Sequence, residues 1–370
     1  MNQPLRVLHT EAATSFGGQE HRIFKEMHAM RDRGHHMEAL CQPQAQLVGR
    51  LREAGFVVHT LAMGGTKNFL RGVPAVRRLL REGRYDVVNT HSRIDTLIAG
   101  TAARLAGTPL IVRTRHLSNK VGSMLSYTWL PHRVTTVSDH VREYLVSRGV
   151  PAERAATVYS PIALPTVPEQ STLREELGLS ADSIVIACVA VMRTTKGHRE
   201  LIEALAPLMA DRPRVHLVLV GAGSPVFEQV QAQIAELPVG DRIHMLGTRR
   251  DVPNVLAGSD LFALATWQEA SGTVFVEAAW AGLPVVGYDV GGVAEMMQPG
   301  VNGILVAPRD VTALREAIAR LLDDPALRQA MGQAGRQWLA QEGRFTLEKL
   351  AERTETLYRE WLSARGRSAA

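Results

Sequence analysis

The chain has 370 residues, of which 45% are hydrophobic and 21% are charged. This length exceeds the roughly 250–300 residues at which a single core stops growing, so we expect two domains. The composition is that of a globular protein and excludes a largely disordered or fibrous chain. The longest strongly apolar run, residues 184–192, is far shorter than the ~20 residues of a membrane span and indicates a buried strand.

The net charge of +5 is divided unevenly along the chain. Residues 1–168 hold 22 Lys and Arg against 12 Asp and Glu, a charge of +10, which leaves −5 for the remainder. Such asymmetry favours different partners for the two halves. The first half should face an anionic partner, and nucleic acid, a phospholipid surface and an acidic substrate are all open at this stage.

The two cysteines, Cys41 and Cys188, lie in apolar runs without a metal or redox spacing, which favours a reducing compartment. Charged and polar residues from Arg6 onward interrupt any hydrophobic segment near Met1, so no secretory signal is predicted. Both observations favour a cytoplasmic protein.

Short apolar runs alternate with amphipathic stretches in the first half, as parallel βαβ units require. The runs are continuous rather than alternating, which is typical of strands covered on both faces. A stretch with three prolines, residues 160–168, interrupts the pattern and is interpreted as an interdomain linker. Before it, we expect strands at residues 5–10, 36–42, 56–63, 86–91, 110–114 and 133–138.

The second half restarts the same alternation and ends in a helical segment. Two doubly wound, Rossmann-like α/β domains are therefore predicted, residues 1–165 and 166–344, with a ligand in the cleft between them. The last segment, residues 345–370, should pack back on the first domain. The strands are expected at residues 183–191, 214–221, 242–246, 260–265, 284–289 and 303–307, and helices at about 196–210, 225–236, 273–281 and 310–323.

The most informative stretch begins at Glu269, directly after a predicted strand, where open α/β sheets place ligand-binding groups. Gly272 and Thr273 open a short helix, with Thr273 as the expected N-cap, and the free amides of such a helix start suit a phosphate. Glu277 lies one turn further on and can point to the same crevice to hold ribose hydroxyls. The alternative is that both glutamates are solvated surface residues, but the composition of the whole stretch favours a site.

This stretch resembles glycosyltransferase family 4, whose members are retaining enzymes with the GT-B fold. Glu269 and Glu277, with seven residues between them, match the family's E-x7-E signature, and residues 282–295 resemble its usual continuation. The family commonly has Gly-Phe-Gly-Leu after the first Glu, whereas residues 270–273 here read Ala-Ser-Gly-Thr, which puts the contacts to the donor sugar in question. The resemblance implies that Glu269 lies by the donor sugar and that Glu277 binds the nucleotide ribose.

Arg193 and Lys196 follow the first strand of the second half and look like the Arg and Lys with which the family clamps the donor diphosphate. Two cations at a helix N-terminus can offset the charge of a leaving nucleoside diphosphate without a divalent metal. A solvated basic pair would be the simpler interpretation in isolation. Since no Asp-x-Asp metal site occurs in a suitable loop, we expect neither a metal nor a cofactor.

Two glycine loops and one histidine complete the predicted donor side. Gly17 and Gly18 follow the first strand, and paired glycines let a backbone approach a bound group and adopt positive φ. His91 ends a strand where the family often has a histidine that touches the donor sugar; a hydrogen-bonded structural histidine is an equal alternative. Gly221 opens a Gly-rich turn that lines the nucleotide pocket in the family, and as a dinucleotide fingerprint it is incomplete, since Val226 replaces the third glycine.

Basic residues elsewhere suggest further contacts. Arg249 belongs to a loop, residues 248–251, that resembles the family's loop beside the nucleotide base. A second group, Arg113, Arg115, His116 and Lys120, surrounds a strand tip on the predicted acceptor side. Residues 70–84 carry five arginines in an amphipathic pattern that is compatible with a membrane surface, and a solvated helix flank is an equal alternative. Nucleic acid is disfavoured because no aromatic residues are interleaved with these arginines.

We therefore expect a metal-independent, retaining glycosyltransferase that moves a sugar from a nucleotide-diphosphate sugar to a glycan or lipid-linked acceptor of the lipopolysaccharide or cell-envelope type. Its expected location is cytoplasmic, with a peripheral position on the inner face of the cytoplasmic membrane as one option. A catalytically inactive nucleotide-sugar or membrane-surface binding protein of the same fold is the alternative. An NAD-dependent oxidoreductase is a second enzymatic rival.

Overall fold

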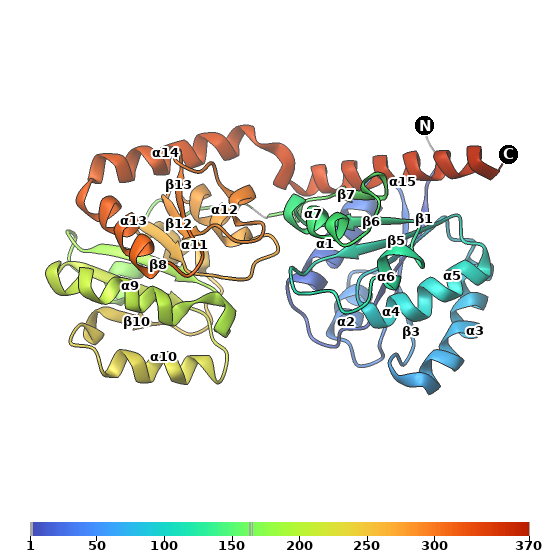
Figure 1. Ribbon diagram of the computed structural model, residues 1–370, viewed down its shortest axis with the longest axis horizontal. Coiled ribbons are helices and arrows are strands. Elements are labelled where there is room, and N and C mark those ends of the chain that lie inside the picture. The colour runs from blue at the N-terminus through green and yellow to red at the C-terminus, as the bar shows by residue number, and fades with distance from the viewer. Residues whose placement is uncertain (1–2, 163, 165, 370) are drawn as a thin grey trace. The chain divides into compact units, whose positions relative to one another are not determined.

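The computed structural model describes residues 3–162, 164 and 166–369. The chain forms two compact units, one of residues Met1–Pro161 with Arg344–Ala370 and one of residues Ile162–Gly343 (Figure 1). Each unit is a parallel sheet flanked by helices, which confirms the predicted α/β class with two Rossmann-like domains. No helix in the described part of the chain is both long and apolar enough to cross a bilayer.

The first unit contains a seven-stranded parallel sheet in the order β3-β2-β1-β4-β5-β6-β7. Six strands lie where the apolar runs predicted them. The seventh, β7, was missed because it is only three residues long and contains no apolar run. The strands are β1 (Arg6–Glu11), β2 (His36–Cys41), β3 (Val57–Thr60), β4 (Val87–Thr90), β5 (Leu110–Arg115), β6 (Arg133–Thr136) and β7 (Ala155–Thr157).

Successive strand residues of the first sheet enter two different cores. Val7 belongs to the cluster under α1, α2 and α15, whereas Leu8 belongs to the cluster under α3 and α5. Because side chains alternate across a strand, a sheet covered on both faces needs apolar residues at consecutive positions. The helices of this unit are α1 (Gly18–Asp32), α2 (Gln46–Glu53), α3 (Gly65–Gly83), α4 (Arg93–Asp95), η1 (Thr96–Gly100), α5 (Thr101–Ala106), α6 (Leu125–Thr128), α7 (Asp139–Ser147), η2 (Ala152–Arg154), η6 (Gly343–Phe345, from its second residue) and α15 (Leu347–Ala369).

The C-terminal helix α15 packs against α1 and is drawn in red along the first unit in Figure 1. Leu357 and Tyr358 are buried in the same core as Val7. The buried Tyr358 hydroxyl accepts a hydrogen bond of 2.9 Å from the Asn89 side-chain amide on β4. At the surface, Glu355 of α15 forms an ion pair of 2.8 Å with Arg33. Both apolar and polar contacts therefore fix this helix to the sheet.

Helix α3 carries the arginines of the amphipathic segment, and its apolar stripe faces the protein core. Val73, Val76 and Leu80 are buried against Leu8 and its neighbours, so they are not available for insertion into a membrane. A contact of this segment with a membrane surface would therefore use its solvent-exposed side chains. To solvent the helix presents arginines such as Arg78, together with Glu82, which pairs with it, and the exposed apolar side chain of Leu70.

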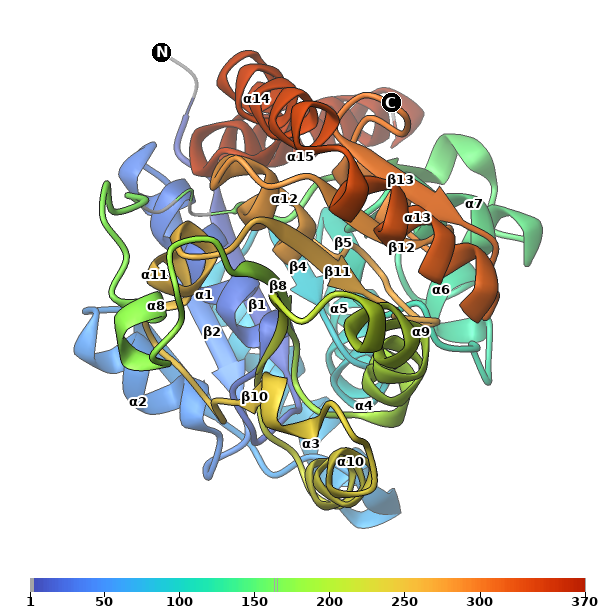
Figure 2. The same cartoon turned by 90° about the vertical axis from the view of Figure 1, so that its left-hand side faces the viewer.

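The second unit contains a six-stranded parallel sheet in the order β10-β9-β8-β11-β12-β13, and all six strands were predicted. Helix α9 packs against α13 on one side of it (Figure 2). The strands are β8 (Ile184–Val189), β9 (Val215–Val220), β10 (Ile243–Met245), β11 (Leu261–Leu264), β12 (Val285–Tyr288) and β13 (Gly303–Val306); the helices are α8 (Leu173–Glu176), η3 (Thr194–Lys196), α9 (His198–Asp211), α10 (Val226–Ala235), η4 (Gly240–Arg242), α11 (Val252–Ala257), α12 (Thr273–Trp280), η5 (Val293–Met296), α13 (Val311–Asp323) and α14 (Pro325–Gln341).

The strand order reverses once in each sheet, between β1 and β4 in the first and between β8 and β11 in the second. At such a switch point the connecting loops leave in opposite directions and open a crevice at the carboxyl ends of the strands, where ligands bind. The loops that follow these four strands carry Gly17, His91, Lys196 and Glu269. The predicted site residues therefore gather at the positions that the topology favours.

Candidate functional site

At the switch point of the second sheet, the loops after β8 and β11 meet through an ion pair. Lys196 Nζ donates to Glu269 Oε2, and both side chains are partly buried. The residues are 73 positions apart in sequence, and the sheet brings them together because β8 and β11 are neighbours. Two residues predicted on separate grounds thus form one charged pair at the carboxyl edge of the sheet.

The backbone holds these two loops against each other. The Thr195 carbonyl accepts hydrogen bonds from Trp267 N at 3.0 Å and from Thr266 Oγ1 at 3.1 Å, and the Trp267 ring N–H donates to the Thr194 carbonyl at 2.8 Å. Gly197 has a φ of +66°, and a Cβ at this position would overlap the Ala265 carbonyl. Only glycine fits such a close approach, so the position of Lys196 is fixed by the fold.

Helix α12 begins immediately beside Glu269. Its N-cap is Gly272 in the left-handed region at φ +78°, and Thr273 is the first helical residue. The expectation that Thr273 is the N-cap was therefore wrong, because a left-handed turn at this point needs a glycine. No side chain caps the first turn. The Phe275 N–H donates to the Gly272 carbonyl at 3.0 Å, which leaves the amides of Thr273 and Val274 for an anion at the helix start. Glu277 is half-buried, one turn into the same helix.

A second pair of glycines holds the backbone of Glu269. The Gly292 N–H donates to the Glu269 carbonyl at 3.2 Å, and a Cβ on Gly291 would overlap that same oxygen. The Gly-Gly step after β12 thus allows the chain to pass directly over Glu269. The sequence resemblance of residues 282–295 to a known pattern now has a physical reason, since these glycines position the glutamate.

The Gly-rich turn after β9 lies beside the loop after β8. Gly221 has a φ of +140°, and a Cβ there would overlap the Ala190 carbonyl. Its N–H donates to the Gly247 carbonyl at 2.8 Å, and Met192 N donates to the Ala222 carbonyl at 3.0 Å. The loops after β8, β9 and β10 therefore pack closely at one edge of the sheet. Met192, in the first of these loops, precedes Arg193.

Arg249, in the loop after β10, is held by two carboxylates. It pairs with Asp251 at 2.6 Å and with Glu176 at 2.9 Å. These partners balance the charge of Arg249, and the hydrogen bonds from Arg249 lower the pKa of Asp251. The predicted contact of Arg249 with a nucleotide base would therefore use its remaining surface rather than its charge.

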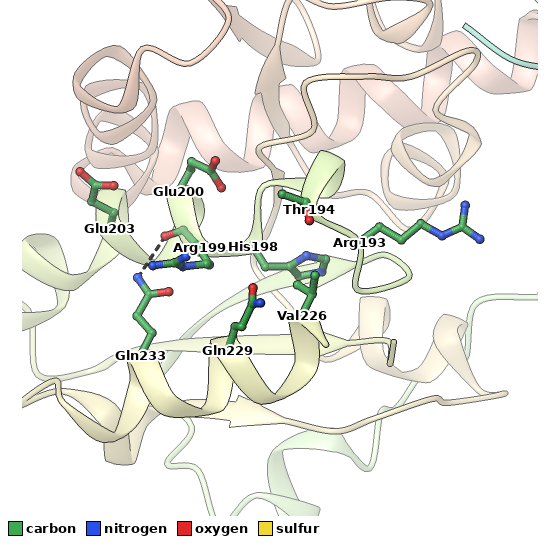
Figure 3. A pocket seen from close by; sticks show the side chains of 9 residues that line it. All are labelled: Arg193, Thr194, His198, Arg199, Glu200, Glu203, Val226, Gln229 and Gln233. Atoms are coloured by element: carbon green, nitrogen blue, oxygen red, sulfur yellow. Dashed lines mark hydrogen bonds between the residues drawn. The ribbon is translucent and has the colours of Figure 1, made fainter. Parts of the chain in front are cut away.

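Arg193 is exposed at the rim of a cavity of about 210 Å³ between α9 and α10. Figure 3 shows its side chain extending away from the other labelled side chains, while Gln233 reaches the Arg199 carbonyl at 3.2 Å. His198 is buried at the base of α9, and burial lowers its pKa to about 4. Within the described residues, no carboxylate lies within 4 Å of Arg193, so its charge is available to an incoming anion.

In the first unit, the predicted acceptor-side residues line one cavity of about 250 Å³. Arg113, Arg115 and His116 are buried, and Lys120 is exposed. His91 lines the same cavity. From the sequence, His91 was predicted to touch the donor sugar. The residues come together because β4 and β5 are neighbours in the sheet and the loops after them share one edge.

His91 is the middle member of a buried histidine row formed with His9 and His116. His9 Nδ1 lies 2.8 Å from His91 Nε2, and His91 Nδ1 lies 2.9 Å from His116 Nε2. Burial lowers the pKa of all three rings, so they are neutral at pH 7. Both ring nitrogens of His91 are occupied by histidines, which gives it a structural partner on each side. His9 was not predicted from the sequence, where the only indication was a polar residue within an apolar strand.

Two buried carboxyls beside the histidine row were also missed. Asp95 accepts hydrogen bonds from the Thr10 hydroxyl at 2.7 Å and from the His91 backbone N–H at 2.9 Å. Glu11, at the end of β1, accepts from Ala13 N at 2.7 Å. Burial, and then the nearby Asp95 charge, raise the pKa of Glu11 to about 8. Single acidic residues give no spacing signal, so only the fold reveals them as a group.

The Gly17–Gly18 loop differs from the expectation of positive φ. Gly17 is the N-cap of α1 with extended backbone at φ −119°, and its N–H donates to Glu20 Oε2 at 2.7 Å. Neither glycine has a positive φ, and a Cβ on Gly18 would meet nothing within 4 Å. The two glycines therefore leave open space at the sheet edge rather than relieve backbone strain.

Two family models match the chain, one in each half. "Glycosyltransferase Family 4" matches residues 16–164 and "Glycosyl transferases group 1" matches residues 169–338. The chain is 31% identical over 274 residues to a GDP-mannose-dependent monoacylated alpha-(1-6)-phosphatidylinositol monomannoside mannosyltransferase of Corynebacterium glutamicum, covering 70% of this chain and 68% of that one. It is 30% identical over 190 residues to an N-acetyl-alpha-D-glucosaminyl L-malate synthase of Bacillus anthracis, covering 51% of this chain and spanning about half, 49%, of that relative.

Solved structures share the fold. The crystal structure of Anabaena HepE in complex with UDP superposes with a TM-score of 0.83 at 24% sequence identity, covering 95% of this chain and 99% of that one. An identity this low shows a common fold. The similarity extends over both units.

Proposed function

Because the chain belongs to glycosyltransferase family 4 and is a glycosyltransferase of the GT-B fold, we propose that its second unit binds a nucleotide-diphosphate sugar at the switch point between β8 and β11. The observation that carries this proposal is the ion pair between Lys196 and Glu269 beside the uncapped start of α12. It places a cation, a carboxylate and free N–H groups at one edge of the sheet.

The residues of this edge divide the work of donor binding. Lys196, Arg193 and the amides after Gly272 stabilise the negative charge that develops on the departing diphosphate, because preorganised donors and cations favour a transition state in which charge appears. Glu269 orients the donor sugar and holds Lys196 in place. Glu277, one turn along α12, accepts hydrogen bonds from the ribose hydroxyls. Gly221 lets the chain turn closely beside the nucleotide.

We propose transfer with retention of the anomeric configuration. The bond between the sugar C1 and the diphosphate oxygen breaks, and the acceptor oxygen bonds to C1 from the same face. The proton of the acceptor hydroxyl passes to the leaving diphosphate oxygen. The cations Arg193 and Lys196 support this step without a divalent metal, and the family resemblance is the ground for retention.

Relatives support a nucleotide-sugar donor and a lipid or small-molecule acceptor. The C. glutamicum relative is named for GDP-mannose and a phosphatidylinositol monomannoside, the B. anthracis relative for L-malate, and the Anabaena structure contains UDP. For this chain we propose a glycan or lipid-linked acceptor of the cell-envelope type, bound by the first unit. The exposed arginines of α3 would bring that unit to an anionic membrane surface chiefly by charge, since Val73, Val76 and Leu80 are buried and Leu70 is exposed.

The experiment is hydrolysis of a panel of UDP-sugars and GDP-sugars by the full chain, measured as released nucleotide with and without EDTA. We expect turnover of one donor class, unchanged by EDTA. Tight nucleotide binding without turnover of any donor or transfer to any acceptor tested would support the inactive binding protein instead. Binding of NAD in place of UDP or GDP would support the oxidoreductase and contradict the proposal.

A further inference from the structure

Two buried arginines in the first unit donate hydrogen bonds only to neutral groups among the described residues. Arg115 donates to the Tyr127 hydroxyl at 3.0 Å and to the Asn119 carbonyl and side-chain oxygens at 2.6 Å each. Arg113 donates to the same hydroxyl at 3.1 Å and to Ser92 O and Thr96 Oγ1. Their exposed fractions are 9% and 3%. All of these hydrogen-bond partners are neutral. Arg113 also interacts electrostatically with the buried Asp95 carboxyl, so of the two arginines it is Arg115 whose charge is left uncompensated.

Buried cations are costly unless an anion compensates them. Among the described residues, no carboxylate lies within 4 Å of Arg113 or Arg115, in contrast to Arg249 and its two acidic partners. The Nε atoms of both arginines are buried without a hydrogen-bond acceptor. Arg115 thus has a donor to spare and no carboxylate partner among the described residues, which is the condition of an anion site without its ligand.

The two arginines border the cavity of about 250 Å³ described above, together with Lys120, Arg93 and His116. The described residues that line it include no Asp and no Glu. Lys120 and Arg93 are exposed at its rim, where they add positive charge without competing carboxylates. The space holds a phosphoryl or carboxylate group with part of the molecule that carries it, and planar guanidinium groups bind such oxyanions in a fixed geometry.

We propose that this cavity binds an anionic group, phosphoryl or carboxylate, on the acceptor substrate, with Arg115 as its anchor. The identification of the anion as part of the acceptor rests on the proposed function, whereas the binding of an anion here does not. Arg113 supports the site by holding the Tyr127 ring, over which its guanidinium lies at 4.3 Å from the centroid. The site would select acceptors that carry a negative charge near the reacting hydroxyl.

The test is isothermal titration of the full chain with inorganic phosphate and, separately, with malonate, in the presence of saturating UDP or GDP. The nucleotide occupies the donor site, so the remaining anion binding reports on the first unit. We expect Arg115→Gln to weaken binding at least tenfold and Lys120→Gln, an exposed position, to weaken it severalfold. Arg78→Gln on α3 removes one charge from an exposed side chain that pairs with Glu82 and should leave the Kd unchanged. The anion that shows this pattern identifies the phosphoryl or the carboxylate class.

Arg115→Lys keeps the charge without the fork and should bind with intermediate affinity, which tests the site even where Arg115→Gln folds poorly. Equal Kd values for wild type, Arg115→Lys and Lys120→Gln would overturn the proposal, as would the absence of phosphate and malonate binding by wild type. If wild type bound neither UDP nor GDP but still bound the anion in an Arg115-dependent manner, the proposed donor site would be refuted and the anion site would stand.

Discussion

Replacing Lys196 with methionine removes the cation of the central pair and keeps most of its apolar stem. If Lys196 stabilises the departing diphosphate, its loss should lower turnover by about 10²–10³, the effect of removing one preorganised donor from a developing negative charge. The cost in folding should be smaller. The paired side chains are 23% and 14% exposed, so water and the Ala270 N–H partly compensate Glu269, and we expect a loss of about 1–2 kcal/mol in the free energy of unfolding.

The assay pairs donor hydrolysis with urea denaturation for each variant. Arg199→Met is the matched control, because it removes the same charge three residues further on, from an exposed side chain. For this variant we expect turnover within about threefold of wild type and a stability change within about 0.5 kcal/mol. The double variant Lys196→Met/Glu269→Gln removes the isolated carboxylate as well. It should regain stability but not turnover. Normal kinetics in Lys196→Met, or recovery of turnover in the double variant, would refute the assigned role.

Three further predictions concern the scaffold. Gly221→Ala should destabilise the chain by at least about 2 kcal/mol, because its φ is positive and a Cβ would overlap a carbonyl oxygen; Gly18→Ala, which meets no atom, should change the urea midpoint little, and equal effects would contradict this. Tyr358→Phe should cost about 1–3 kcal/mol by leaving the buried Asn89 amide without its acceptor, and a neutral midpoint would argue against the docking of α15. The histidine row has pKa values below those of the unfolded chain, so the unfolded state binds more protons below about pH 6.5 and stability should fall on acidification by about 1.4 kcal/mol per pH unit for each ring. Glu11 and Asp95, whose pKa values are both raised, oppose this with two groups against three rings, and equal stability at pH 5.5 and 7.5 would contradict the assignment.

The sheets could be predicted because both are covered on two faces. Consecutive apolar residues such as Val7 and Leu8 enter different cores, and this requirement leaves a continuous run in the sequence. The three-residue β7 leaves no such run and was missed. The Glu269 region was found because residues that hold one ligand lie on one loop and one helix, so that their spacing is visible along the chain.

The buried polar groups of the first unit could not be predicted in the same way. His9 lies on β1 and Asp95 on α4, after β4, and each alone has an ordinary structural interpretation. Their meaning depends on pairing between β1, β4 and β5, which brings distant positions to one edge. The positive φ expected at Gly17 was wrong for a related reason, since the conformation of a glycine depends on the helix start that follows it.

Hydrogen–deuterium exchange with and without UDP and GDP tests the location of the donor site most directly. The account predicts that the nucleotide that binds slows exchange in residues 190–197 and 267–277, the loops after β8 and β11 with the start of α12. The first unit's cavity around Arg115 should show no comparable change unless an anion is added. Protection confined to other segments, or no protection by a nucleotide that is hydrolysed from its sugar, would contradict the central claim.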